Sequence, residues 1–219
     1  MNHEHCLYPA RRRQLLLGLL GAGAALLARR TFAGEAMAGM NEHQHHHLAH
    51  GENSGMVRRR EVSCTVPSLG LRREDGSAAA FPDEIEAGRP VLLNFIYTSC
   101  TTICPLVSEV FSRVQEALGA ERAAVDLVSI SIDPEYDTPQ RLAAYARKFG
   151  AGPHWHFYTS SQATSVALQQ AFEVYRGDKM SHEAVTFLHG AAPGRWVRLD
   201  GFATAEQLIG EYRGLVQPG

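Results

Sequence analysis

The run Val91–Tyr97, VLLNFIY, constrains the fold of this chain more than any other stretch, because it is apolar almost throughout. Such a run is expected of a central strand that is covered on both faces of a sheet. Helix signals follow it directly, since Pro105 can occupy a first helical turn and apolar residues recur at helical spacing until Gly119. The sequence therefore predicts a buried strand that leads into a helix.

The same alternation of strand-like and helix-like stretches continues to the end of the chain. The next expected elements are a strand at 125–132, a helix that Thr138 caps and Pro139 starts, a strand at 154–159, a helix at 161–174, a hairpin of 184–188 with 196–199, and a helix at 204–216. This order predicts an α/β sandwich with right-handed crossovers.

The composition narrows the class of protein. Of the 219 residues, 45% are hydrophobic and 20% charged, which excludes a wholly disordered chain and favours one folded domain. The formal net charge of −2, without a basic stripe, argues against nucleic acid as a partner. Four cysteines are too few for a disulfide scaffold.

Residues 1–38 have the layout of an export signal. A basic start in RRRQLLLGLLGAGAALLARR (11–30) precedes the apolar run Leu15–Ala28, which is shorter than the about 20 residues of a membrane span. We expect cleavage after Ala33 or Ala38 rather than an anchor, and no lipid anchor because the cleavage region has no cysteine. The paired arginines resemble a twin-arginine signal. These features predict a protein in the periplasm or at the extracytoplasmic face of the inner membrane.

Residues 39–60 show no periodicity that builds a core, so we expect a flexible tail ahead of a folded domain at 61–217. Histidines crowd into this tail, and Met40 and Met56 lie near them. Imidazole groups on a mobile chain can hold copper, nickel or zinc weakly, and a plain solvated linker is the alternative. The candidate weak ligands are His43, His45, His46, His47 and His50.

Export leaves Cys64, Cys100 and Cys104 in an oxidising compartment, where thiols tend to pair. Cys64 lies in an alternating stretch, and we expect it to be a small buried residue. Cys100 and Cys104 stand where the first central strand gives way to the helix. This is the place at which α/β sheets bind their ligands, so the pair is a functional candidate by position.

The spacing of Cys100 and Cys104 favours a metal clamp over a disulfide. Residues i and i+4 of a helix have Cβ atoms about 5–6 Å apart, whereas a relaxed disulfide needs about 3.8 Å. Two thiolates that bind one metal at about 2.3 Å each tolerate the wider gap. A looped Cys100 still permits a disulfide, including an inert one. The helix N-terminus is expected to favour the thiolate form of Cys104.

Two thiolates rarely complete a metal site, so other donors are needed. His182 precedes a strand and is expected on a loop over the sheet edge, although an exposed loop histidine usually has no such role. Asp133 ends the second strand on the same edge as the thiols, where it either forms an Asx-turn before Pro134 or supports the site or a partner. A structural role is expected of the remaining domain histidines, His154, His156 and His189.

The strings YTSCTTICP (97–105) and SISIDPEYDTP (129–139), with His182 before an apolar strand, resemble the Sco/SenC family of copper chaperones over about residues 61–217. The resemblance implies a thioredoxin-like sandwich, in which a central mixed sheet has helices on both faces and an N-terminal strand extension. It also implies one tight copper site for Cu(I), Cu(II) or both, with Cys100, Cys104 and His182 as ligands and Asp133 as the accessory acid.

Many family members help to assemble the copper A centre of cytochrome c oxidase, which implies an oxidase subunit as copper acceptor. A thiol reductase or another copper chaperone are further implied partners. The chain departs from the usual pattern at Thr101, where relatives carry proline, and at Met180-Ser181, where they carry Val-Asp. Two thiolates and an imidazole suit Cu(I) and hold Cu(II) with an added oxygen or nitrogen, although zinc fits the same ligands.

Three functions remain open at this point. The preferred hypothesis is an exported metallochaperone rather than an enzyme. The second is a thiol–disulfide oxidoreductase in which Cys100 attacks and Cys104 resolves. The C-x-x-x-C spacing and the lack of a proline in 182–185 count against it, because such enzymes generally place a cis-proline there. The third is a periplasmic metal buffer that relies on the histidine tail.

Overall fold

The computed structural model describes residues 57–216, except 66, 86–87 and 191–194. The predicted export signal and the histidines of the predicted tail lie outside the described residues. The elements, in chain order, are β1 (Arg58–Ser63), β2 (Gly70–Arg73), β3 (Ala78–Ala80), α1 (Phe81–Ile85), β4 (Val91–Ile96), α2 (Ile103–Leu118), the 3-10 turn η1 (Gly119–Ala124), β5 (Asp126–Ser131), α3 (Pro139–Lys148), β6 (Trp155–Thr159), α4 (Gln162–Ala171), the 3-10 turn η2 (Lys179–Ser181), β7 (Val185–His189), β8 (Arg195–Asp200) and α5 (Ala205–Val216).

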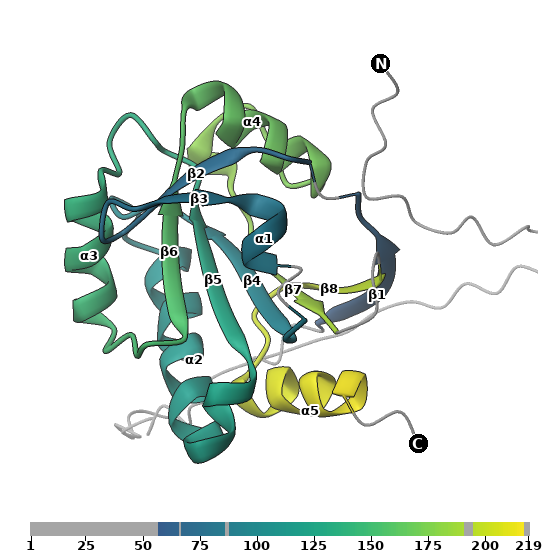
Figure 1. Ribbon diagram of the computed structural model, residues 1–219. Coiled ribbons are helices and arrows are strands. Elements are labelled where there is room, and N and C mark those ends of the chain that lie inside the picture. The colour runs from purple at the N-terminus through teal and green to yellow at the C-terminus, as the bar shows by residue number, and fades with distance from the viewer. Residues whose placement is uncertain (1–56, 66, 86–87, 191–194, 217–219) are drawn as a thin grey trace, which may run out of the picture. The chain divides into compact units, whose positions relative to one another are not determined.

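The strands form one mixed sheet in the order β1-β8-β7-β4-β5-β6-β2-β3 (Figure 1). Strands β4, β5 and β6 run parallel, whereas β7, β8 and β1 on one side and β2 and β3 on the other pair antiparallel. Every residue of β4 and β5 is buried, as the apolar runs predict. Because parallel strands end at the same edge, the chain after β4 and the chain after β5 emerge side by side.

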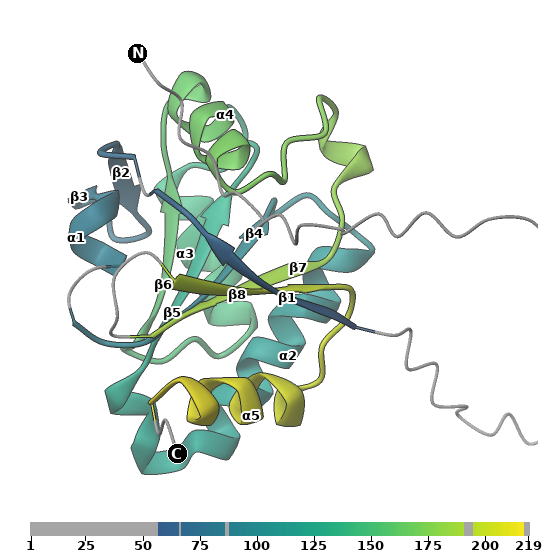
Figure 2. The same ribbon diagram turned by 90° about the vertical axis from the view of Figure 1, so that its right-hand side faces the viewer.

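Helices cover both faces of the sheet. Phe172, at the end of α4, packs edge-on against Phe95 of β4 and Trp196 of β8, with ring centroids 5.6 and 5.2 Å away. Trp155 of β6 packs against Phe111 of α2, with ring centroids 5.8 Å apart. Figure 2 shows α4 on one side of the sheet and α2 with α5 on the other. The predicted α/β sandwich is confirmed.

Local signals at helix starts act as expected. The hydroxyl of Thr138 accepts a hydrogen bond from the backbone N–H of Arg141, and Pro139 is the first residue of α3. Ser161 caps α4 in the same way through Thr164. By contrast, no side chain caps α2. Its first N–H groups are therefore available to whatever lies in front of the helix.

The sheet begins earlier than the sequence indicated. Residues 58–60, which the sequence pattern places in the flexible tail, pair with β8 as the first half of the edge strand β1. Two of these arginines form ion pairs with neighbouring elements. Arg59 donates a hydrogen bond to Glu211 at 2.9 Å, and Arg60 donates one to Asp200 at 2.9 Å. A run of arginines suits an exposed sheet edge and is no sign of disorder there.

Cys64 of the folded domain is buried, as the sequence predicts. Its side chain is 5% exposed and belongs to the core. The described part of the chain contains no helix of the length and hydrophobicity that crossing a membrane requires.

Candidate metal centre

The two thiols lie at the junction between β4 and α2. Cys100 follows β4 in a turn that is closed by its own N–H, which donates to the carbonyl oxygen of Tyr97 at 3.1 Å. Cys104 is the second residue of α2, and its backbone N–H donates to the sulfur of Cys100 at 3.4 Å. Both side chains are buried and both thiols are free. An uncapped helix start thus directs a donor at the first thiol.

Cys100 is the more acidic thiol. Burial opposes the ionisation of Cys100. Hydrogen bonds from the backbone N–H groups of Cys104 and Thr102, together with the side chains of Cys104 and Tyr97, favour the thiolate. Their combined effect exceeds that of burial and lowers the pKa of Cys100 to about 7. The lowered pKa favours the Cys100 thiolate, the form that binds metal and attacks disulfides.

Cys104 behaves in the opposite way, which corrects the sequence-based expectation. Burial raises the pKa of the Cys104 thiol, and the negative charges of Cys100 and Asp137 raise it further. The expectation failed because it used the helix N-terminus alone. The side chain of Cys104 is 1% exposed, while its N–H stabilises the neighbouring sulfur instead.

His182 lies just after η2, and its imidazole contacts the strand that leads to the thiols. Its Nε2 is 2.9 Å from the carbonyl oxygen of Phe95. Burial lowers the pKa of His182, so the ring is neutral at pH 7. Because a carbonyl only accepts, Nε2 carries the proton and Nδ1 keeps a lone pair. Metal-binding histidines are oriented in the same manner, with one ring N–H donated to a carbonyl oxygen.

The structure brings the three predicted ligands to one end of the sheet but does not join them in one cluster. Ile103, the neighbour of Cys104, and His182 line the same cavity of about 1060 Å³. Within the described residues, however, no group of three or more His, Cys, Asp or Glu side chains is close enough to hold a metal ion. Joint ligation by Cys100, Cys104 and His182 therefore requires the segment around η2 or the Cys100 turn to move.

Asp133 holds η2 against the end of β5. Its carboxylate accepts a hydrogen bond from Nζ of Lys179 at 2.5 Å, and Lys179 lies three residues before His182. Its backbone N–H donates to the hydroxyl of Ser131 at 3.0 Å. The predicted accessory acid thus lies beside the segment that carries the imidazole and contacts that segment through Lys179.

Asp137 is a site residue that the sequence analysis did not identify. It is fully buried and accepts hydrogen bonds from the Thr98 backbone N–H at 3.1 Å, from the Thr98 hydroxyl and from the Ser131 hydroxyl at 2.6 Å. Burial raises its pKa against the effect of these hydrogen bonds. Asp137 therefore ties the turn before Cys100 to the end of β5. The sequence offered one signal for Asp137 as a site residue, which is that it follows Asp133 by four residues.

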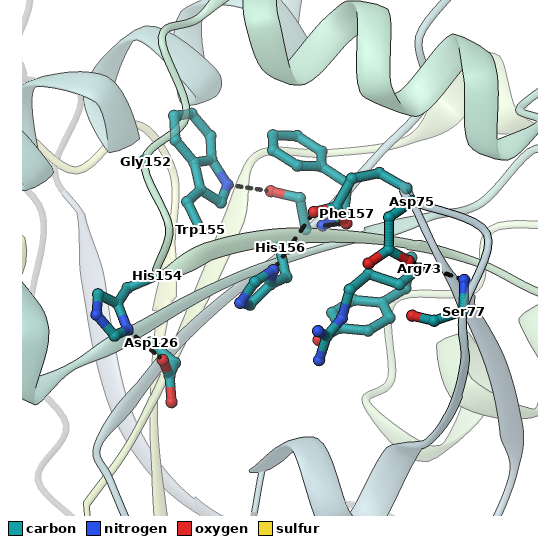
Figure 3. Close-up of polar contacts among 12 residues, drawn as sticks. Arg73, Asp75, Ser77, Asp126, Gly152, His154, Trp155, His156 and Phe157 are labelled. Atoms are coloured by element: carbon teal, nitrogen blue, oxygen red, sulfur yellow. Dashed lines mark hydrogen bonds and ion pairs between the residues drawn. The ribbon is translucent and has the colours of Figure 1, made fainter.

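The remaining domain histidines have partners away from the thiols. Figure 3 shows the ring of His154 directed at Asp126, with Nδ1 3.5 Å from the carboxylate. Nδ1 of His156 lies 3.3 Å from the carboxylate of Glu74. The ring of His189 packs on Trp196, with centroids 4.6 Å apart. These contacts agree with the structural role that was predicted for all three.

The donor set near the thiols fits a soft metal ion. Two sulfurs, one of them with a lowered pKa, stand at the sheet end at which His182 places its imidazole. Thiolates and imidazole are the donors that Cu(I) prefers, and zinc accepts them too. The described residues therefore match a copper ion by the chemistry of their donors.

Comparison with known proteins identifies relatives of this chain. A curated relative, the SCO1 protein homolog of Bacillus subtilis, is 31% identical over 133 residues, which cover 57% of this chain and 68% of the relative. The crystal structure of a SCO1/SenC family lipoprotein from Bacillus anthracis has a TM-score of 0.62 at 21% identity and covers 71% of this chain and 96% of that one. This likeness establishes the thioredoxin-like fold.

Two further solved structures are similar. ScoI of Bradyrhizobium japonicum with copper bound has a TM-score of 0.58 at 26% identity, covering 68% of this chain and 98% of that one. BsSco, a member of the Sco family of cytochrome c oxidase assembly proteins, has a TM-score of 0.59 at 24% identity, covering 70% and 94%. The SCO1/SenC family model matches residues 73–217. This chain belongs to the SCO1/SenC family.

Proposed function

We propose that this protein is an exported metallochaperone that binds one copper ion through Cys100, Cys104 and His182 and delivers it to an acceptor protein. The observation that carries the proposal is the hydrogen bond from Cys104 N–H to Cys100 Sγ, at the strand end where Phe95 positions the imidazole. It supplies a thiolate at neutral pH beside a second sulfur and a neutral nitrogen donor. Copper binding to a relative, ScoI of Bradyrhizobium japonicum, agrees with this proposal.

The unequal acidities of the thiols suggest an order of uptake. The Cys100 thiolate binds the incoming ion first, because the lowered pKa of Cys100 favours its ionisation. Cys104 then loses its proton to solvent as its sulfur binds the same positive ion, which offsets the effect of burial. His182 completes the set through Nδ1 after the segment around η2 moves toward the sulfurs. Release to an acceptor reverses these steps.

The acceptor that fits best is the copper A subunit of a cytochrome c oxidase. The family relation supports this choice, as does the description of BsSco as an assembly protein of that oxidase. A thiol reductase would keep Cys100 and Cys104 reduced. A second copper chaperone would supply the ion. In this proposal, residues 1–38 direct export, the histidines at 43–50 gather copper weakly, and the domain that begins with β1 transfers it.

Transfer kinetics separate a chaperone from a metal buffer. The full chain loaded with Cu(I) is mixed with increasing amounts of an apo copper A domain, and at set times the two proteins are separated and the copper in each is measured. A chaperone passes copper within a complex, so the transfer rate rises with acceptor concentration. A buffer releases copper at a rate that does not depend on the acceptor, and this result would contradict the proposal. His182→Ala is expected to weaken binding and alter the rate.

A second candidate function is thiol–disulfide exchange, which the acidity of Cys100 specifically favours. The Cys100 thiolate would attack a substrate disulfide, and the Cys104 thiolate would then attack Cys100 Sγ and release the substrate as a dithiol. The protein is oxidised by two electrons and needs a thiol reductase to recover. Rapid reduction of a model disulfide by the apo protein, unchanged in His182→Ala, would favour this function over copper transfer.

A further inference from the structure

Met180 has a position that packing does not explain. It is 74% exposed, more than any other exposed large hydrophobic residue of the described chain. A side chain that exposed gains little from the hydrophobic effect. The other four methionines precede residue 57 in the sequence, so Met180 supplies the thioether of the folded domain. Its surroundings therefore indicate what the sulfur does there.

The sulfur of Met180 contacts the side chain of the residue that precedes the Cys100 turn. The hydroxyl of Tyr97 donates a hydrogen bond to Sδ of Met180 at 3.6 Å. The side chain of Tyr97 also helps to lower the pKa of the Cys100 thiol. Tyr97 itself is the last residue before the turn that carries Cys100.

The turn that carries Met180 is held in place from several sides. The carboxylate of Asp178 accepts a hydrogen bond from the Met180 N–H at 2.9 Å. Lys179 binds Asp133, and its Nζ lies 5.7 Å from the centre of the Tyr97 ring. His182, at the other end of the turn, is bonded to the strand. These contacts hold the turn in the arrangement described, while the Met180 side chain extends from it toward Tyr97.

The chemistry of the thioether suits copper(I). A thioether is a soft and neutral donor that has no proton to lose, and Met has rotatable bonds that let its sulfur reach an ion near Cys100. The imidazole of His182 is meanwhile held by the carbonyl of Phe95. In the arrangement that the structure describes, the Met180 thioether is linked to the start of the Cys100 turn through the Tyr97 hydroxyl, whereas ligation by His182 requires movement.

We propose that Met180 is a copper(I) ligand, which holds the ion together with Cys100 on the solvent side of the site. The proposal rests on the copper-binding function proposed above. On uptake, a bond forms between copper and Sδ of Met180, and it breaks when the nitrogen of His182 takes its place; on release the order is reversed. The copper stays Cu(I) throughout, and no electron is transferred.

The test uses the full chain with Cu(I) alone, in competition with a chromogenic Cu(I) chelator that keeps free copper too low for the histidine tail. His182→Ala removes the competing donor, so copper in this variant is expected to have a third sulfur. His182→Ala combined with Met180→Leu, which preserves size and apolarity, is expected to bind copper about tenfold more weakly, within the range for loss of a group that supports a metal site. X-ray absorption at the copper edge should count one sulfur fewer.

The control is His182→Ala combined with Phe202→Leu, another exposed apolar residue, which should match His182→Ala in both measurements. Circular dichroism verifies that all variants are folded. If the Met180→Leu double variant equals His182→Ala in affinity and in sulfur count, the inference about Met180 is wrong while the copper function stands. If the wild-type chain does not bind Cu(I) more tightly than a Cys100→Ala/Cys104→Ala variant, the proposed function itself fails and Met180 has no copper to bind.

Discussion

The backbone N–H of Cys104 is directed at the sulfur of Cys100, with 3.4 Å between nitrogen and sulfur. This contact makes the two thiols unequal, because the donor stabilises negative charge on Cys100 while the Cys104 side chain remains buried in the core. In a metal site with two equivalent thiols, neither cysteine would be favoured as the first to bind or react. The asymmetry predicts that copper capture and thiol chemistry both begin at Cys100.

The first prediction concerns the reactivity of the reduced apo protein. Iodoacetamide should modify Cys100 with a rate that rises through a pKa of about 7, because only the thiolate reacts. Cys104 should stay unmodified in the same pH range, since burial raises its pKa. Mass spectrometry of the peptides at a series of pH values measures both. Modification of Cys104 ahead of Cys100 would refute the proposed asymmetry.

Asp137 is predicted to matter for stability. In the wild-type protein, the Asp137 carboxylate accepts hydrogen bonds from the Thr98 N–H and the Ser131 hydroxyl. In Asp137→Asn, the new NH₂ group is itself a donor, so it cannot accept these hydrogen bonds. Unfolding free energy should fall by about 1–3 kcal/mol, the usual effect of leaving a buried polar group unsatisfied. Denaturant unfolding of the apo protein provides the measurement.

The matched control for this variant is Asp133→Asn. The partner of Asp133, Lys179, is 41% exposed, and partly exposed ion pairs contribute about 0–1 kcal/mol. Asp133→Asn should therefore be the less destabilised of the two. Equal losses in both variants would mean that the buried network around Asp137 has no special role.

The histidine tail gives a prediction that is independent of the folded site. Deletion of residues 43–50 should remove the weak copper equivalents and leave one tight equivalent with unchanged affinity. Isothermal titration calorimetry of the full and shortened chains with copper distinguishes the weak sites from the tight site. Loss of the tight equivalent on deletion would place the main site in the tail and not at the thiols.

Much of the fold was predictable because strong local patterns agree with the final packing. The apolar run Val91–Tyr97 became the buried β4, and Thr138 with Pro139 started α3. The hairpin of β2 and β3 was not predicted, because Ala78–Ala80 has no strand pattern and is ordered by pairing with β2, which in turn pairs with β6. Short edge elements of this kind depend on tertiary contacts that a local pattern does not contain.

The candidate site was predictable in its parts but not in its electrostatics. The position of Cys100 and Cys104 between strand and helix followed from the sequence, whereas the acidity of each thiol depends on which side chain is buried. Asp137 escaped notice because its partner Thr98 is distant in the chain and meets it only in the folded protein. The bond between His182 and Phe95 is of the same long-range kind.

Copper titration of the reduced full chain under anaerobic conditions tests the central claim most directly. With Cu(II), followed by optical absorption and electron paramagnetic resonance, one tight equivalent should show strong sulfur-to-copper charge transfer. This signal should vanish in Cys100→Ala/Cys104→Ala and change in His182→Ala. A tight equivalent that survives in the double-cysteine variant, or a spectrum that His182→Ala leaves untouched, would contradict the account.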